Sequence, residues 1–532
     1  MTSETRSARP ATRLPGPAAA AIGGSVLLTI TIGLLGPSAM VPALGGPAWL
    51  PPFSLDARPD PRLVVGLAAA AILLGGLGTL AALAATRAEV RPGARAEVPP
   101  RPSPEARPSP EARPSPETRR ETATGASDAL REGAAAARVL VLLGCVVAAV
   151  LAFLPPSGSG DHLNYAAYGR MVVLGVNPYT HGATDLPGDP IADAVEEPWR
   201  EEPSVYGPVA TAAQAMASWI GGDSLKLTLF VLALVNSAAF VATGLLIDRF
   251  TRDDPARRLR GALLWTANPL LLYQLVAGMH ADTLAIACMV AALLARARPA
   301  VSGLLLGLGV AVKVNAGLVA LGPAWELRRR PGRLALMAGV ALAVVVAGYA
   351  LAGADAVSPV TRTSKSVSHA SFWKLVQGWL QAVVGEGSAY RAEIQIGSLV
   401  VLVVVAWSLF RLAGRLCGAL SAEVVAVVLV SAYVFATPYV LPWYDGMAFG
   451  VLALVAATAL DGFLVAHLLV LSLAYLPARV VGQPEDLEWL RTVVRPQVVP
   501  WALLALTAAL VWWAWRAAGR VRTPRASAAP PP

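Results

Sequence analysis

The feature that most constrains this chain is a succession of apolar runs, each about as long as a helix that crosses a lipid bilayer. One crossing takes about 20 mostly apolar residues. Of the 532 residues, 55% are hydrophobic and only 14% are charged, a balance that soluble globular domains of this size do not have. The sequence therefore predicts an all-α polytopic membrane protein.

The lengths and borders of the apolar runs predict about 14 transmembrane helices. We expect them near residues 18–41, 63–85, 137–154, 226–247, 261–277, 282–296, 299–312, 314–327, 334–352, 396–412, 419–437, 443–460, 462–476 and 498–518. The stretch 209–220 is short and amphipathic, so we expect it to lie in the membrane interface.

Basic loops predict the orientation, because short arginine-rich loops stay in the cytoplasm. The arginines cluster at 249–260, 296–298, 328–333 and 516–525. We therefore expect a plasma-membrane protein with both termini in the cytoplasm. Three polar loops then face outside, and these are residues 155–225, 353–395 and 477–497.

One low-complexity segment interrupts the apolar pattern. It contains three copies of Arg-Pro-Ser-Pro-Glu between residues 101 and 117, a composition too polar to bury a core. The predicted organisation is an N-terminal hairpin at 1–85, a disordered cytoplasmic linker at 86–136, a transmembrane catalytic domain at 137–518 and a cytoplasmic tail at 519–532.

Several classes of function are disfavoured. The three cysteines lie inside apolar runs, so no disulfide framework is expected. The arginines flank membrane spans instead of lining a groove with interleaved aromatics, so we expect no nucleic-acid partner. The chain has no Walker loop, dinucleotide fingerprint, HExxH or GxSxG motif. An enzyme on the outer face would thus take its donor from a lipid, not from a nucleotide.

The first outer loop holds the densest group of acids and aromatics. Asp161 follows Pro155-Pro156 at the end of a predicted span. It either caps a helix or acts as a general base at the depth of the lipid headgroups. The acids between Asp185 and Glu202 form either a solvated surface or one that faces carbohydrate. A weak cation site is a further alternative that no ligand spacing supports. We predict turns at Asn177-Pro178-Tyr179 and Tyr206-Gly207-Pro208, with the tyrosine rings anchored in the membrane interface.

Polar residues within later spans form a second group of candidates. His280 and Asp282 are two residues apart, so they share a cavity only if a turn orients them; polar groups at this depth favour a functional role. Lys313 interrupts an apolar hairpin, where it either snorkels to the interface or binds a lipid-linked phosphate. His181 and His467 receive no role.

Cations on the predicted outer face also suit a phosphate. One such segment contains Arg362, Lys365, His369 and Lys374 beside tryptophans, and a second contains Arg479, Arg491 and Arg495. Trp443 and Tyr444 are expected on the same face.

These motifs resemble those of the GT-C glycosyltransferases, and most closely those of the actinobacterial polyprenol-phosphate-mannose-dependent α-1,6-mannosyltransferases. The resemblance spans about residues 139–517. The motifs that carry it are Asp161, Tyr165-Ala166-Ala167-Tyr168-Gly169-Arg170, Gly175-Val176-Asn177-Pro178-Tyr179, Tyr206-Gly207-Pro208, Ala267-Asn268-Pro269, His280-Ala281-Asp282 and Lys313. Related sequences often have His-Asn-Asp where this chain has His280-Ala281-Asp282.

The resemblance implies an inverting transfer of mannose from polyprenyl-phosphate mannose to a growing α-1,6-mannan on a lipid anchor, as in lipomannan. Asp161 would be the general base, and Lys313 with one or more of the cations of the 353–395 loop would neutralise the phosphate. No metal is assigned. The implied substrate-binding residues are His162, Tyr165, Tyr168, Asn177, Tyr206, His280, Asp282, Lys313, Arg362, Lys365, Lys374, Trp443 and Tyr444. The alternatives are transfer of lipid-linked arabinose or glucose, a lipid or sugar flippase, and a non-catalytic scaffold of the cell envelope.

Overall fold

The computed structural model describes residues 14–90, 116–358 and 366–520, and in these residues every regular element is helical. Seven helices of the described part are long and apolar enough to cross a membrane. They are α1 (Gly16–Leu35), α2 (Pro61–Val90), α3 (Pro116–Ala152), α6 (Leu225–Thr251), α12 (Pro331–Ala352), α15 (Arg391–Cys417) and α19 (Val499–Arg520). The all-helical prediction is confirmed.

Four shorter apolar helices accompany the long ones. They are α9 (Asp282–Leu294), α10 (Pro299–Val312), α16 (Ala422–Ala436) and α18 (Leu460–Ala474). Even together with the long helices, the described residues hold fewer crossings than the 14 or so that the sequence predicts. That count is wrong because several apolar runs fold into pieces too short to cross a bilayer at 1.5 Å per residue.

The broken runs have local causes. The run predicted at 261–277 becomes α7 (Pro255–Leu264), α8 (Pro269–Leu271) and the π-helical η3 (Leu272–Ala277), because Pro269 cannot continue a helix and the Asn268 side chain caps the next one. The run at 314–327 becomes the 3-10 helix η4 (Val314–Ala320) and α11 (Leu321–Leu327). The run at 443–460 holds only η6 (Pro442–Tyr444) and α17 (Asp445–Leu452).

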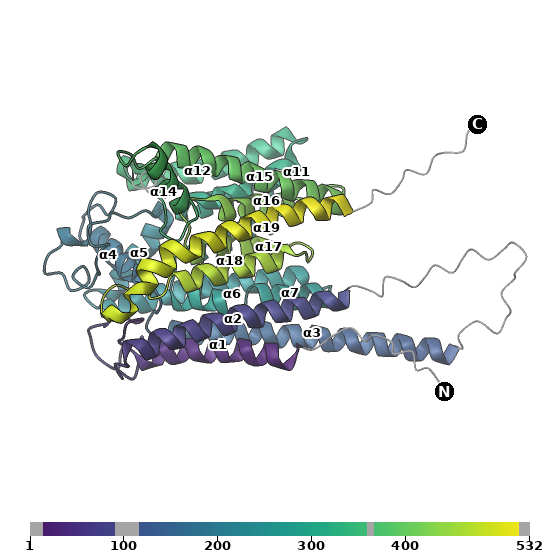
Figure 1. The fold of residues 1–532 in the computed structure, drawn as a ribbon, viewed down its shortest axis with the longest axis horizontal. Coiled ribbons are helices and arrows are strands. Elements are labelled where there is room, and N and C mark those ends of the chain that lie inside the picture. Colours follow the sequence, from purple (N-terminus) through teal and green to yellow (C-terminus); the bar gives the residue numbers. More distant parts are fainter. Residues whose placement is uncertain (1–13, 91–115, 359–365, 521–532) are drawn as a thin grey trace, which may run out of the picture.

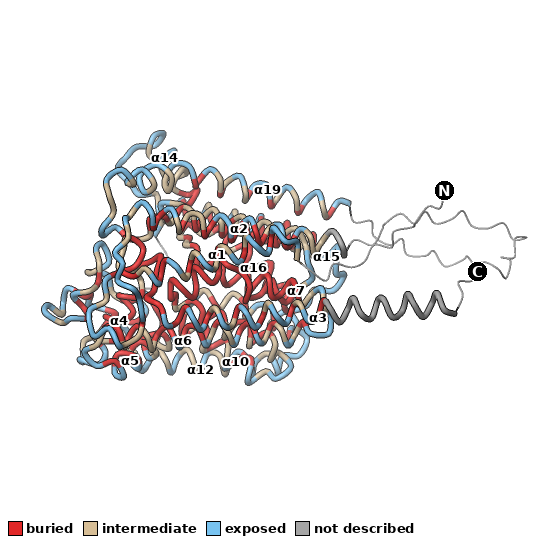
Figure 2. Tube along the Cα trace, turned by 90° about the horizontal axis from the view of Figure 1, so that it is seen from below, coloured by how far each residue is buried: buried red, intermediate tan, exposed pale blue. Residues whose placement is uncertain are grey.

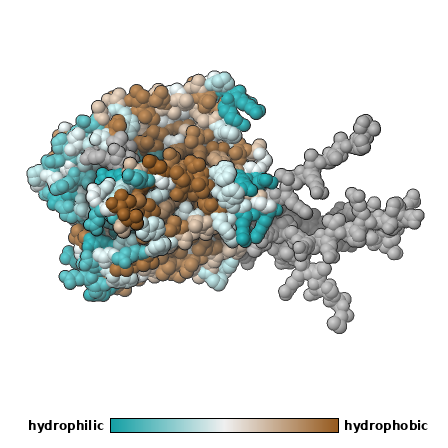
Figure 3. Space-filling model, turned by 45° about the horizontal axis from the view of Figure 1, so that its top comes forward, coloured by the Kyte–Doolittle hydropathy of each residue, from teal (hydrophilic) through white to brown (hydrophobic). Residues whose placement is uncertain are grey.

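The outer surface of the bundle is apolar around its middle. Figure 3 shows this brown band between hydrophilic ends. Buried segments run along the inside of the bundle, whereas α19 and the amphipathic α14 (Trp373–Val384) are exposed along much of their length (Figure 2). In α12 only 6% of the apolar window is buried. Such a band matches the hydrocarbon layer of a membrane.

The N-terminal hairpin is packed into the bundle. Helices α1 and α2 pack on each other, and α2 also packs on α18, α7 and α8. Arg87 of α2 forms an ion pair with the buried Asp461 of α18 at 2.9 Å. Helix α2 continues to Val90 and α3 begins at Pro116, so residues 86–90 and 116–136 of the predicted linker are helical. Residues 91–115 lie outside the described part of the chain.

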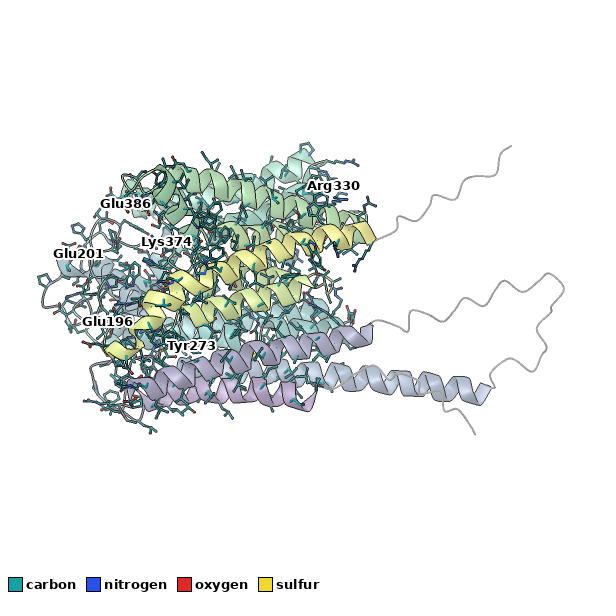
Figure 4. The ribbon with its side chains drawn as sticks, in the orientation of Figure 1. Glu196, Glu201, Tyr273, Arg330, Lys374 and Glu386 are labelled. Atoms are coloured by element: carbon teal, nitrogen blue, oxygen red, sulfur yellow. The ribbon has the colours of Figure 1, made fainter. Side chains whose placement is uncertain are left out.

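The polar loops gather at one end of the bundle (Figure 1). This end carries α4 (Asp161–Val173), α5 (Pro208–Gly221) and α14, and the arginine turn with Arg330 lies at the other end (Figure 4). The end with α4, α5 and α14 also holds the short helices η2 (Ala183–Asp185), η5 (Ala354–Val357), η7 (Glu485–Leu487) and η8 (Leu490–Val498). Helix α5 coincides with the stretch predicted to lie in the interface.

Candidate functional site

Asp161 is placed by the first turn of α4. Gly160 precedes the helix and makes no side-chain cap, while the Asp161 backbone N–H donates to Ser159 Oγ at 3.1 Å. The Asp161 carboxylate faces the bundle instead of closing the helix end, and its Oδ2 lies 3.6 Å from Nδ1 of His280. The geometry therefore disfavours the helix-cap interpretation.

The surroundings of Asp161 make its carboxylate more basic than usual. Burial raises the pKa of Asp161 to about 6, and the Ser159 hydrogen bond and Lys313 only partly oppose this effect. The side chain still exposes 23% of its surface, so a substrate can reach it. A carboxylate with this pKa is mostly ionised at neutral pH, yet accepts a proton more readily than an ordinary aspartate.

His280 lies in a turn between η3 and α9. Its ring stacks on Trp443 with centroids 3.6 Å apart and planes 13° from parallel. Met279 before it has φ of +54°, a conformation that costs a non-glycine residue free energy and is enriched at functional sites. The turn brings both His280 and Asp282 to the same cluster, which a continuous helix could not do.

Lys313 follows α10 directly and turns inward. Its Nζ forms an ion pair with Asp282 and lies 3.7 Å from the ring centroid of Tyr444 and 5.7 Å from that of Tyr206. Both distances are within the range of a cation–π contact. The lysine is therefore neutralised inside the protein and does not snorkel.

Aromatic side chains line one side of this site, called here the aromatic wall, and they are Tyr165, Tyr206, Trp443 and Tyr444. The hydroxyls of Tyr165 and Tyr206 are 2.7 Å apart, and Tyr168 donates to the carbonyl of Glu202 at 2.9 Å. His162 is fully buried next to Asp161, and neither ring nitrogen has a hydrogen-bond partner among the described residues. The site cluster is defined here as Asp161, Tyr165, Tyr206, His280, Asp282, Lys313, Trp443 and Tyr444.

Other predicted site residues lie outside this cluster. Asn177 donates to Asp355 at 3.1 Å near the surface. Arg362 and Lys365 lie outside the described residues. Lys374 donates to Gln377 at 2.8 Å, and Lys374 and Arg495, after the larger effect of partial burial, lower the pKa of His369.

Arg495 connects these cations to the site cluster. Its guanidinium donates to the carbonyls of Ala474, Tyr475 and Pro477 and lies 5.3 Å from the Tyr475 ring centroid. The Tyr475 ring meets Trp443 edge-on at 5.1 Å. The cationic group of Lys374 and Arg495, with His369 beside it, thus lies next to the aromatic wall of the cluster.

Two further ion pairs support the site. Arg479 binds Glu196 and also donates to the carbonyl of Ser38, which ties the first loop to the C-terminal loop and the hairpin. The contact could have been predicted from the sequence, because the first loop is rich in acids and the C-terminal loop carries arginines. His467, which received no role from the sequence, hydrogen-bonds Asp445 at 2.8 Å. In the described residues, no three His, Cys, Asp or Glu side chains converge in a way that could hold a metal.

Comparison with known proteins gives matches to one family. Residues 120–329 match the model of the α-(1→6)-mannopyranosyltransferase N-terminal domain of the MptA/B family. α-(1→6)-Mannopyranosyltransferase A of Corynebacterium glutamicum is 27% identical over 330 residues, which are 55% of this chain and 66% of that protein. The protein of the same name from Mycobacterium tuberculosis is 26% identical over 320 residues, or 54% of this chain and 60% of its own.

A third relative covers a shorter region. α-(1→6)-Mannopyranosyltransferase B of Corynebacterium glutamicum is 29% identical over 196 residues, or 36% of this chain and 30% of that protein. The chain thus spans less than two thirds of the length of these curated relatives. No solved structure matches it.

Proposed function

We propose that this chain, a distant homologue of the α-(1→6)-mannopyranosyltransferases, is a membrane glycosyltransferase. The resemblance predicted from the sequence is confirmed at this family level. The proposed reaction moves mannose from polyprenyl-phosphate mannose to a growing α-1,6-mannan on a lipid anchor, with inversion at the anomeric carbon. The proposed location of the site is the outer face of the plasma membrane.

The observation that carries this proposal is the placement of Asp161. It combines a pKa of about 6 with a partly exposed carboxylate at the end of an apolar bundle. A base at that depth is within reach of a sugar hydroxyl on one lipid-anchored substrate and of the headgroup of another. Neither substrate needs to leave the membrane.

The proposed chemistry is a single displacement. The acceptor hydroxyl gives its proton to Asp161 and its oxygen forms a bond to the anomeric carbon of mannose. The bond from that carbon to the phosphate oxygen breaks, and its electron pair leaves with the polyprenyl phosphate. The attack comes from the face opposite the leaving group, so a β-linked donor gives an α-linked product.

The leaving phosphate needs positive charge that is not already neutralised. Lys313 is paired with Asp282, so we assign it mainly to shaping the pocket. Lys374 and Arg495 have no ion pair with a carboxylate among the described residues. We therefore assign the phosphate to this cationic group, with Arg362 and Lys365 as further candidates from the same loop.

The test is transfer of radiolabelled mannose from polyprenyl-phosphate mannose to an α-1,6-mannoside acceptor, in membranes that contain wild type or Asp161→Asn. We expect wild type to be active and the variant to lose at least about 100-fold, because it has no base. Glu201→Gln is the matched control, an exposed carboxylate of the same loop (Figure 4), and should retain wild-type activity.

The outcomes separate the parts of the proposal. Absence of mannose transfer by abundant wild type would refute the donor assignment, and lipid-linked arabinose and glucose would be assayed next. Equal rates in wild type and Asp161→Asn would refute the base. The anomeric configuration of the product, read by NMR, decides between inversion and retention.

A further inference from the structure

A buried acid–imidazole pair lies outside the site cluster. Asp445 is the first residue of α17, and His467 lies in the middle of α18. Nδ1 of His467 is 2.8 Å from Oδ2 of Asp445, and the two side chains are 3% and 0% exposed. The Phe435 ring lies 4.5 Å from the imidazole. Ionisable groups inside an apolar bundle are costly and usually have a function.

Asp445 has fewer hydrogen-bond partners than another buried aspartate, Asp461, in the same region. Asp461 receives two bonds from Arg260, at 2.7 and 2.9 Å, and one ion pair from Arg87. Asp445 has only His467, and its Oδ1 has no partner among the described residues. A buried pair with incomplete hydrogen bonding adds little stability on balance. A geometric role therefore accounts for the pair better than a stabilising one does.

The geometry that the pair controls is that of the aromatic wall. Asp445 directly follows Trp443 and Tyr444, which form η6. Trp443 stacks on His280, and Tyr444 covers Lys313. Movement of Asp445 would thus displace both rings at once.

Contacts at the next residue of α17, Gly446, leave little space. A Cβ on Gly446 would lie 2.9 Å from Ile286 of α9 and 3.0 Å from Leu275 of η3. These two elements flank the turn that carries His280 and Asp282. Helix α17 is therefore held between this contact and the bond to His467, so the pair sets the position of η6 relative to that turn.

Helix α18 contacts this region at a second point, through the Trp443 ring of η6. Tyr475, at its C-terminal end, meets Trp443 edge-on at 5.1 Å. It lies two helical turns after His467. Two points of contact define an orientation, whereas one alone would leave η6 free to rotate about it.

We propose that Asp445 and His467 are positioning residues that fix Trp443 and Tyr444 against His280 and Lys313. The consequence for the reaction rests on the proposed function, whereas the positioning itself does not. Neither residue contacts the reacting groups. They act through the aromatic wall, whose misplacement by about 1 Å is enough to lower turnover on the order of 100-fold.

Hydrogen–deuterium exchange tests the positioning without any assay of activity. In Asp445→Leu, we expect amides of residues 438–446 to exchange at least about tenfold faster than in wild type. Local opening costs less free energy in this variant, because the hydrogen bond to His467 is already absent. Asp445→Asn keeps an oxygen that accepts from His467, and should exchange like wild type. Asp189→Asn is the control, a partly buried aspartate of the first loop whose partner Arg170 keeps a second ion pair with Asp223, and it should leave residues 438–446 unchanged. Unchanged exchange in Asp445→Leu would overturn the proposal.

A double-mutant cycle tests the consequence for catalysis. We expect Asp445→Leu to lower kcat at least about tenfold with a smaller change in KM, and to lower it hardly further in a Trp443→Ala background, because the pair acts through that ring. Independent, multiplying effects would overturn this route. If wild type transfers no mannose, the proposed function fails, while hydrogen exchange still decides the positioning.

Discussion

Asp161 combines access to substrate with an environment that disfavours its charge. Because burial raises its pKa to about 6, the base is increasingly protonated as the pH falls through that value. We predict that kcat/KM is constant above about pH 7 and falls roughly tenfold per unit well below pH 6. An aspartate with its ordinary pKa of 3.8 would keep the rate constant over most of this range.

The pH profile has an internal control. The residual rate of Asp161→Asn should not show the inflection near pH 6, because the titrating group is absent. A wild-type profile that is flat from neutral pH to about pH 5 would show that another group accepts the proton.

Lys313 and Asp282 illustrate a pair whose members depend on each other. Lys313→Met leaves the buried Asp282 carboxylate without its cation, which is expected to cost about 3–5 kcal/mol of stability. Adding Asp282→Asn removes the unpaired charge. We predict that the thermal midpoint of the purified protein falls in Lys313→Met and recovers in part in the double variant. A double variant less stable than Lys313→Met would contradict this account.

The limits of sequence reasoning are visible at this scale. Asp161 could be identified because it directly follows an apolar run, and His280, Asp282 and Lys313 because they lie within or between apolar runs. Their mutual contacts could not be predicted, because the partners are separated by tens to hundreds of residues. The phosphate role expected for Lys313 did not anticipate its pairing with Asp282. The role of His467 was missed because its partner comes from another helix.

Among the elements, α4 depends on one close approach to α5. A Cβ on Gly169 would lie 2.2 Å from the carbonyl oxygen of Gln214, so only glycine allows this spacing. We predict that Gly169→Ala pushes α4 away from α5, with a loss of about 1–3 kcal/mol of stability from overpacking. It should also lower mannose transfer, because Asp161 lies on the same short helix.

Gly378→Ala provides the comparison at the same end of the bundle. Gly378 lies in α14, and a Cβ there would meet nothing within 4 Å. Alanine should be neutral or slightly stabilising at this helical position. Equal thermal midpoints and rates for the two variants would refute the close-packing argument.

Element boundaries were predictable to different degrees. The long apolar helices follow from run length alone, and the short run that became α5 was predicted with nearly its observed bounds. The breaks at Pro269 and between η4 and α11 were harder to recognise, because a hydropathy average does not distinguish a continuous crossing from two short helices. Helix breaks of this kind bring backbone turns and polar groups to the site cluster, which uninterrupted helices would have kept apart.

For the whole molecule, the packing of the hairpin predicts tolerance in the segment after it. The contacts of α2 with α18 and α7 hold the hairpin in place. The family match also begins only at residue 120. We predict that replacing residues 101–115 with a glycine–serine segment of equal length leaves mannose transfer unchanged. A marked loss in an equally abundant variant would indicate a role for the repeats themselves.

The bridge from Arg479 to Glu196 and Ser38 bears on how the protein is made. Asp161 is synthesised early, but its neighbours Trp443 and Tyr444, and the arginine that fastens its loop, leave the ribosome some 280 residues later or more. A nascent chain halted before η6 would hold Asp161, the proposed general base, without Trp443, Tyr444 and Arg479. If the proposed function holds, incomplete translation products would be unable to consume the lipid-linked sugar, and activity would begin only late in synthesis.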